Sequence, residues 1–342
     1  MTHIINHGRA GRWAKSACVA LVLFILLPLA ACTQSSYCSV TMFAMDTTVS
    51  IQIAASHKDA DEVLNYCEQL LYRLDGLLSR SRKGSDVWRI NHGLVTSGLD
   101  AHTVAVLDAA LRMSDSTSGA FDITVAPLIE LWEACSDAGR MPEDDELSAA
   151  LSLVGYSQLT LDGDTLTKSC EGVKIDLGGI AKGYAADVIA EYLESQNVAY
   201  GIVSFGSCIA VVGSKPDGSP FRIAIRDPGN MSRVAGYVTM RDGVLSVTGD
   251  YERYYEIQGE KYHHVLSPYT GYSAPAVWHS VAVVCGSGII ADALSTALFV
   301  SGDYESVYDV WRSTDLEFEG VFIGDGGTYV SAGMSGNYQP AQ

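Results

Sequence analysis

The sequence predicts an α+β protein in which helices pack on mostly antiparallel sheets. Residues 58–78 carry apolar side chains at helical spacing, among them Val63, Leu70 and Leu74. Between residues 207 and 267, short β-type runs alternate with turn sequences such as Asp242-Gly243. Amphipathic helices together with strands that reverse at tight turns are typical of this mixed class.

The N-terminal half predicts several short elements. They are a strand pair within residues 40–53, interrupted at Met45-Asp46-Thr47, helices at 58–78, 102–116 and 147–154, and a hairpin over 159–166. The basic, serine-rich loop 79–84 is either solvated or part of an anion site. Residues 119–128 read as a buried strand or turn, and Asp122 is either a capping residue or a ligand contact.

Residues 174–193 combine a short strand, a glycine pair and a helix. Residues 174–177 alternate in polarity, Gly178-Gly179 interrupts them, and a helix-forming run follows. Adjacent glycines let the backbone approach a ligand, and a helix that starts there offers N–H groups to an anion. Asp176 and Lys182 flank the turn. With an apolar strand at 199–205, this makes a βαβ-like unit that is either structural or a phosphate site.

The C-terminal half is β-rich and contains a second helix that follows glycines. The expected strands lie at 209–212, 221–226, 234–240, 244–247, 254–258, 261–266 and 280–285, and 318–323 with 328–331 forms a hairpin. Gly286-Ser287-Gly288 opens a helix over 289–300, and residues 302–314 also look helical. We find no segment that divides the chain, so we expect one large domain, with the two glycine-initiated helices suggesting two related halves.

The N-terminus has the features of a secretion signal. Arg9, Arg12 and Lys15 precede an apolar stretch at 17–28 that is too short for a confident membrane span. Residues 29–32, Leu-Ala-Ala-Cys, resemble the lipobox of bacterial lipoproteins. The resemblance implies a signal peptide at 1–31, a lipid on Cys32, a tether at 32–39 and anchoring to the membrane outside the cytoplasm. The alternative is an ordinary cleavable signal.

Charge and cysteine content exclude some classes of function. Loss of the signal changes the formal net charge from −18 to −21, because the signal holds three basic residues. Such a surface repels nucleic acid and anionic headgroups, so a phosphate ligand would need a metal ion or an isolated Lys or Arg beside it. Six cysteines remain beyond Cys32 without CxxC spacing, which disfavours a zinc site and leaves their pairing open.

Two further groups could carry chemistry. Asp292 and Thr296 lie four residues apart and project from one helical face, where both could reach Mg²⁺, although an aspartate near a helix start is also favoured by the helix dipole. His263 and His264 are adjacent on a strand and point to opposite faces. At most one of the two histidines can therefore face a given site.

Taken together, the chain resembles the FAD:protein FMN transferases of the ApbE family. Six segments match in order and cover about residues 40–332: Met45-Asp46-Thr47, 119–128, 175–187, 246–255, 264–271 and 291–296. The resemblance implies a T-fold-like flavin transferase domain over 40–332, followed by a tail at 333–342. It also implies FAD as substrate, dependence on Mg²⁺, and transfer of FMN to a threonine of a partner protein with release of AMP. The partner would be a flavoprotein subunit of a membrane or surface redox system.

Residue roles carry over by position. The resemblance implies that the flavin nucleotide contacts Met45, Ser81, Ala120, Phe121, Asp122, Asp176, Lys182 and Leu266. It implies that the side chains of Asp292 and Thr296 hold the metal together with a backbone oxygen of Gly179. His264 is our choice for a base near the acceptor hydroxyl. An FAD pyrophosphatase that releases FMN and AMP, and a non-catalytic FAD-binding lipoprotein, are the alternatives.

The chain departs from the family pattern at three places. Asp46 stands where the family often has glycine. Ser81, with basic neighbours, stands in a loop that usually carries an aromatic residue, and Ser207-Cys208 replaces a Gly-Asn pair. None of these changes removes a predicted metal ligand.

Overall fold

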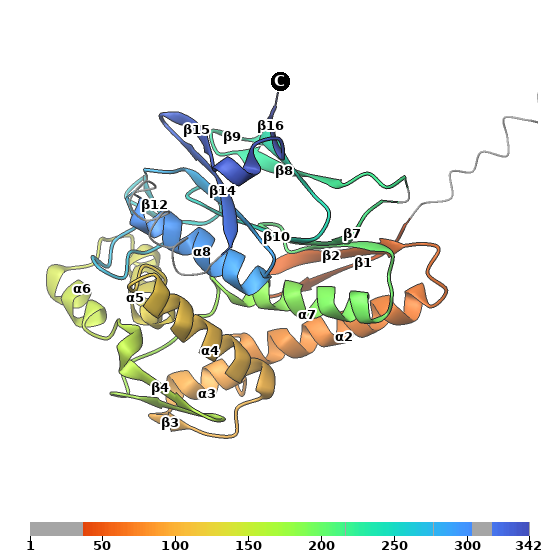
Figure 1. The fold of residues 1–342 in the computed structure, drawn as a ribbon. Helices are drawn as coiled ribbons and strands as arrows, with labels where there is room; N and C mark the ends of the chain where they lie inside the picture. Colours follow the sequence, from red (N-terminus) through yellow and green to blue (C-terminus); the bar gives the residue numbers. More distant parts are fainter. Residues whose placement is uncertain (1–36, 216, 276, 303–316, 342) are drawn as a thin grey trace, which may run out of the picture. The chain divides into compact units, whose positions relative to one another are not determined.

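A large antiparallel sheet forms the centre of the folded unit (Figure 1). The computed structural model describes residues 37–215, 217–275, 277–302 and 317–341, so the predicted signal, Cys32 and nearly all of the helix expected at 302–314 lie outside the described residues. Neighbouring strands follow the order β1 (Tyr37–Ala44), β2 (Thr47–Ala54), β6 (Tyr200–Ser204), β7 (Cys208–Gly213), β10 (Gly243–Gly249), β13 (Ser280–Cys285), β14 (Phe318–Gly324) and β15 (Gly327–Val330). The pairings from β2 to β15 are antiparallel, as predicted.

The sheet is covered on both faces. One face packs against α2 (Ala60–Leu78), α7 (Ala181–Ser195) and α8 (Gly288–Ser301), and the other against a smaller sheet with the order β16 (Tyr338–Pro340), β9 (Asn230–Met240) and β8 (Phe221–Asp227). Strand β10 illustrates this arrangement, because successive side chains of a strand point to opposite faces of the sheet. Val244 joins the core on the helical side, and Leu245 joins the core beneath the smaller sheet.

The remaining elements lie around this sandwich. They are α3 (Asp86–His92), α4 (Ala101–Ser116), α5 (Ala126–Asp137) and α6 (Asp144–Leu151), a small sheet of β3 (Val95–Thr96), β5 (Thr165–Lys168) and β4 (Leu159–Asp162), and a hairpin of β11 (Tyr254–Ile257) and β12 (Glu260–His263). Three short 3₁₀ helices complete the description at Ile123–Val125, Tyr156–Gln158 and Ala332–Met334. The side chain of Trp132 is fully buried between α5, α6 and the β11–β12 hairpin.

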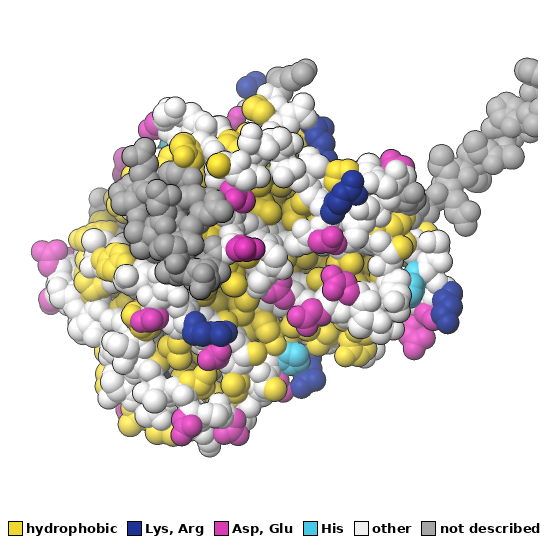
Figure 2. All heavy atoms as spheres, in the orientation of Figure 1, with side chains coloured by type: hydrophobic (Ala, Val, Ile, Leu, Met, Phe, Trp, Pro, Cys, Tyr) yellow, Lys and Arg dark blue, Asp and Glu magenta, His cyan; other side chains and the backbone are white. Residues whose placement is uncertain are grey.

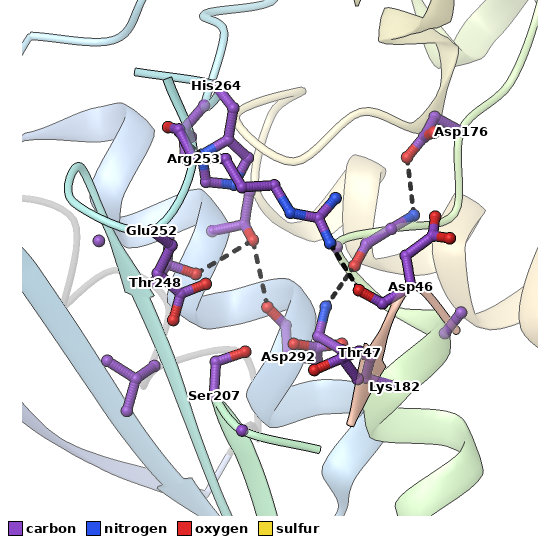
Figure 3. Close-up of a pocket in the computed structure, with 18 of the residues that line it drawn as sticks. Asp46, Thr47, Asp176, Lys182, Ser207, Thr248, Glu252, Arg253, His264 and Asp292 are labelled. Atoms are coloured by element: carbon purple, nitrogen blue, oxygen red, sulfur yellow. Dashed lines mark hydrogen bonds between the residues drawn. The ribbon is translucent and has the colours of Figure 1, made fainter. Parts of the chain in front are cut away.

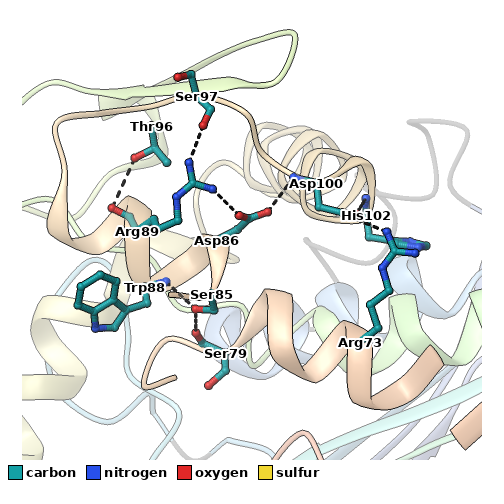
Figure 4. Close-up of polar contacts among 10 residues, drawn as sticks. All are labelled: Arg73, Ser79, Ser85, Asp86, Trp88, Arg89, Thr96, Ser97, Asp100 and His102. Atoms are coloured by element: carbon teal, nitrogen blue, oxygen red, sulfur yellow. Dashed lines mark hydrogen bonds and ion pairs between the residues drawn. The ribbon is translucent and has the colours of Figure 1, made fainter. Parts of the chain in front are cut away.

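A buried carboxylate organises the segment after α2 (Figure 4). Asp86 accepts hydrogen bonds from the Arg89 guanidinium and from the backbone N–H of Asp100, each at 2.8 Å. Ser85 caps α3 and donates its hydroxyl to the carbonyl of Ser79 at 2.6 Å. These bonds satisfy the polar groups of a tight turn and hold the loop between Ser79 and Ser85 in place.

Two sequence predictions are wrong. Residues 174–177 form no strand, because the N–H groups of Ile175 and Asp176 donate to the Asn91 side chain and to the Ile123 carbonyl, each at 2.8 Å. The βαβ-like unit therefore does not exist, and β6 pairs antiparallel with β2 and β7. The second concerns residues 119–128, which contain no strand: the chain turns at 119–121, residues 123–125 form a 3₁₀ helix, and α5 begins at Ala126 with Pro127 in its first turn, where a proline N–H is not needed.

The turns of the β-rich region also need correction. Of the three turns named for residues 207–267 at the sequence level, the one at Gly259-Glu260 joins two strands that pair with each other, β11 and β12. The turns at 215–218 and at Asp242-Gly243 connect strands of different sheets, while β8 and β9 pair with each other. The predicted tail contains β16, which pairs with β9, and β1 begins at Tyr37, within the predicted tether. The suggestion of two related halves stays a prediction.

The described surface agrees with the acidic composition. On the face seen in Figure 2, Asp and Glu side chains are scattered between Lys and Arg side chains. All six cysteines from Cys38 to Cys285 are free thiols. Within the described ranges, no helix combines the length and apolar character needed to cross a bilayer.

Candidate functional site

One cavity gathers every site residue that the sequence suggested within the described chain. Its volume is about 950 Å³, near the upper end for ligand pockets. Its lining includes Met45, Ser81, Ala120, Phe121, Asp122, Asp176, Gly179, Lys182, His264, Leu266, Asp292 and Thr296. These residues come from both ends of the chain, and the fold brings them to one place.

A glycine contact between α7 and α8 sets the geometry of the cavity floor. A Cβ atom on Gly183 would lie 2.0 Å from the carbonyl oxygen of Gly288, and one on Gly288 would lie 2.5 Å from that of Gly183. Only glycine permits such an approach of two backbones. The contact lets the backbone N–H of Gly183 donate to Asp292 Oδ2 at 3.0 Å.

Oxygen atoms of the kind that hold a hard cation surround Asp292. Ser246 on β10 donates its hydroxyl to Asp292 Oδ1 at 2.8 Å, so each carboxylate oxygen accepts one bond and keeps a lone pair. The hydroxyl of Thr296 lies 3.4 Å from that of Thr248 and 3.3 Å from the position of a Cβ atom on Gly179. The backbone of Gly179 therefore lies beside Thr296.

This donor set fits Mg²⁺ as it is usually bound in phosphate-handling sites. The described residues contain no group of three or more His, Cys, Asp or Glu side chains placed to hold a metal. Mg²⁺ commonly uses one or two carboxylates and completes its shell with water and substrate phosphate oxygens. A single buried carboxylate beside hydroxyl and backbone oxygens meets that requirement.

Cationic side chains reach the same cavity (Figure 3). Lys182, in the first turn of α7, donates to the carbonyl of Gly178 at 2.7 Å, and Arg253 donates to the carbonyl of Asp46 at 3.1 Å. Both hydrogen-bond partners are neutral carbonyl groups, so neither bond is an ion pair that would offset the positive charge. The two side chains supply the local compensation that a phosphate ligand needs in this acidic protein.

His264 lines the cavity, whereas its neighbour His263 packs inward. The Nε2 of His263 lies 2.9 Å from the carbonyl of Ala274, and its ring packs against Phe299. The Nδ1 of His264 lies 3.1 Å from the carbonyl of Arg253. A carbonyl only accepts, so Nδ1 carries the proton and Nε2 keeps a free lone pair. Burial lowers the pKa of His264 to about 4, which keeps the ring neutral at physiological pH.

The turn between β1 and β2 is left-handed at two residues that are not glycine. Met45 and Asp46 have φ values of 53° and 56°. A family preference for glycine at position 46 is thus explained by the backbone, and Asp tolerates this conformation better than most residues. The N–H of Met45 donates to Asp75 Oδ1 at 2.9 Å, which together with the bond from Arg253 holds the turn at the cavity wall.

Asp122 has a local structural role at the cavity wall. Its Oδ1 accepts from the N–H and the hydroxyl of Thr124, at 2.7 and 2.5 Å, and its Oδ2 accepts from the N–H of Tyr156 at 2.8 Å. Burial raises the pKa of Asp122, and these hydrogen bonds oppose that effect. Asp122 is therefore a capping residue, and its side chain also contributes to the lining.

The sequence did not identify all of the lining. Arg80 enters the cavity, where its Nε donates to Asp176 Oδ2 at 2.9 Å and its NH2 group donates to Glu133. The basic loop 79–84 indicated that a cationic side chain could lie near the site, but the sequence did not indicate the ion pairs of Arg80. Further lining residues that were not assigned a role are Arg226, Met231, Thr248, Glu252, Arg253 and Tyr255.

The fold and this cavity place the chain in a known class. The chain belongs to the ApbE family, whose pattern matches residues 45–321. Among curated relatives, an FAD:protein FMN transferase of Vibrio cholerae is 35% identical over 268 residues, which cover 76% of this chain and 80% of the relative. One of the same name from Haemophilus influenzae is 30% identical over 302 residues, covering 83% and 86% of the two chains.

Solved structures of ApbE proteins have the same fold as this chain. The ApbE protein of Thermotoga maritima superimposes with a TM-score of 0.79 at 30% identity, covering 88% of this chain and 99% of that one. A mutant of the flavin transferase ApbE from Vibrio cholerae gives a TM-score of 0.77 at 30% identity, covering 89% of this chain and all of that one.

Proposed function

We propose that this protein is a Mg²⁺-dependent FAD:protein FMN transferase that attaches FMN to a threonine hydroxyl of a partner protein and releases AMP. Membership of the ApbE family and the names of its relatives support the flavin transferase activity. The observation that carries the proposal is the single cavity into which twelve predicted site residues converge. The acceptor would be a flavoprotein subunit of a membrane or surface redox system.

The reaction uses groups that the cavity supplies. The threonine oxygen forms a bond to the phosphorus on the FMN side of the diphosphate, the bond from that phosphorus to the bridging oxygen breaks, and AMP leaves with the electron pair. Lys182 and Arg253 would offset the negative charge of the diphosphate and hold it in position for the attack. Nε2 of His264 accepts the threonine proton.

Asp292, Thr296 and the backbone of Gly179 would hold Mg²⁺ at the diphosphate. The ion would supply Lewis-acid stabilisation of the charge that develops on phosphate oxygens. Its hydroxyl and backbone partners would leave coordination positions for substrate oxygens and water.

The test is to incubate residues 33–342, which contain the whole folded unit, with FAD, Mg²⁺ and a candidate acceptor that carries an exposed threonine. A fluorescent, covalently labelled acceptor and one AMP per label are expected. FMN and AMP without labelling would make the protein an FAD pyrophosphatase. Binding of FAD without either product would make it a flavin-binding lipoprotein.

The His264→Gln variant is expected to lower kcat by about 10²–10⁴-fold with little change in FAD affinity, because it removes a proton acceptor and not a binding contact. In the wild type, kcat should also fall as the pH drops toward 4, since the pKa of His264 is about 4 and the protonated ring cannot accept a proton. The bound diphosphate should raise that pKa and shift the fall to higher pH. Rates measured from pH 4 to 8 test both points.

His263→Gln is the matched control, because His263 lies next in the chain but packs away from the cavity. That variant should lose stability and keep its pH profile. A His264→Gln enzyme with the wild-type rate would remove His264 from the mechanism.

We also propose that Cys32 carries a lipid that anchors the protein to the membrane outside the cytoplasm, on the strength of the lipobox-like residues 29–32. The acidic composition supports an anchor of this kind, because such a surface has little electrostatic attraction to anionic headgroups. A Cys32→Ser protein should therefore leave the membrane fraction on sedimentation. A Cys32→Ser protein that sediments with membranes as the wild type does would contradict the lipid anchor.

A further inference from the structure

Arg80 holds its guanidinium in a fixed plane at the cavity wall. Its Nε donates to Asp176 Oδ2 at 2.9 Å and its NH2 group donates to Glu133. A guanidinium is planar and donates its hydrogen bonds in that plane. Two carboxylate partners from different segments therefore fix the plane of a side chain that is 28% exposed and lines the cavity.

The charges around Arg80 do not suit a phosphate. One guanidinium faces two carboxylates, so the cluster of Arg80, Asp176 and Glu133 carries a formal charge of −1. Burial by itself lowers the pKa of Arg80, but the charges of Asp176 and Glu133 outweigh this effect and raise it. Lys182 and Arg253, which hydrogen-bond to carbonyl groups, suit phosphates better.

The neighbourhood of Arg80 suits a flat ring. Tyr255 lines the same cavity, packs on Trp132 with ring centroids 5.7 Å apart, and has a pKa raised to about 12, by burial first and then by the charge of Glu133. Its hydroxyl is therefore neutral, and Ile129 adds an apolar lining residue. Ser81, next in the loop, is exposed and offers no ring.

We propose that Arg80 is a stacking platform for one ring system of FAD. The proposal rests on the proposed function, which puts FAD in this cavity. Guanidinium groups stack on aromatic faces, and Asp176 beside it offers carboxylate oxygens to a ring N–H. Both adenine and isoalloxazine have a flat face and N–H donors, so the experiment decides between them.

The test compares Arg80→Lys and Arg80→Ala with Arg82→Lys in the full chain, by measuring the affinities of FAD, FMN and AMP and the steady-state constants. Arg82 is a matched control, because it is a basic, exposed residue of the same loop and does not line the cavity. Arg80→Lys keeps a positive charge but replaces the planar guanidinium by an ammonium group, which cannot stack on a ring. We expect it to raise the KM for FAD about 10-fold, equivalent to about 1.4 kcal/mol, with kcat within about 3-fold of wild type.

The two half-ligands identify the ring. Weaker binding of FMN with unchanged AMP affinity would place isoalloxazine on Arg80, and the reverse would place adenine there. Wild-type affinities for all three ligands in Arg80→Ala would overturn the proposal, as would an equal loss for both half-ligands accompanied by a lower melting temperature. If the wild type turns over FAD and the Arg80 variants match it, only this proposal fails. If the wild type binds none of the ligands, the proposed function fails with it.

Discussion

Replacing Asp292 by asparagine is expected to lower FAD turnover by about 10²–10³-fold while the protein stays folded. The charge that would hold Mg²⁺ is lost, but the amide can still accept from the N–H of Gly183 and donate to the hydroxyl of Ser246. Both buried bonds therefore keep a partner, which limits the loss of stability. Release of AMP from FAD at saturating Mg²⁺, together with thermal unfolding, measures the two effects separately.

Asp187→Asn is the matched control for this prediction. Asp187 is a carboxylate on α7 at the same helix contact, and burial raises its pKa, but it does not line the cavity. It accepts from the N–H groups of Gly288 and Ile289 and from the hydroxyl of Ser287, and so caps α8. Its replacement should cost about 1–2 kcal/mol of stability and leave kcat nearly unchanged. An Asp292→Asn enzyme with wild-type turnover would rule out the metal assignment.

Replacing Gly183 by alanine is expected to destabilise the protein by about 3 kcal/mol or more. The new Cβ would lie 2.0 Å from the carbonyl oxygen of Gly288, and a backbone atom cannot rotate out of the way as a flexible side chain can. The helices α7 and α8 would have to separate, which would also move Asp292 away from Gly179. Urea denaturation measures the first effect and AMP release the second.

Gly286→Ala tests whether the loss is specific to that contact. Gly286 lies two residues before α8, and a Cβ built on it meets nothing within 4 Å. Its replacement should change stability by no more than about 0.5 kcal/mol. A Gly183→Ala protein as stable as Gly286→Ala would show that the two helices can adjust their spacing freely.

Local patterns predicted the parts of the site that depend on short spacing. Asp292 and Thr296 could be paired because helical geometry places residues four apart on one face. His264 could be separated from His263 because neighbouring strand residues point in opposite directions. In both cases the prediction depends only on residues that are close together in the sequence.

The parts that failed depend on partners far along the chain. Residues 174–177 alternate like a strand, but their N–H groups find the Asn91 side chain and the Ile123 carbonyl instead of a neighbouring strand. Turn sequences showed where the chain reverses but not which of two sheets receives the next strand, so the pairing of β8 with β9 in a separate sheet was not predicted. The pairing of Arg80 with Asp176 and Glu133 joins three separate segments, and no local pattern predicts such ion pairs.

If Cys32 carries the proposed lipid, strand β1 would limit how far from the membrane the enzyme can work. It runs from Tyr37 to Ala44 and leads directly into Met45 at the cavity. With the lipid proposed at Cys32, the chain up to Tyr37 spans at most about 18 Å, and β1 adds about 26 Å. The reacting groups would then work within a radius of about 45 Å from the bilayer surface. Acceptors embedded in or docked on the same membrane would lie within this radius, whereas a freely diffusing acceptor would have to approach the headgroups to be modified.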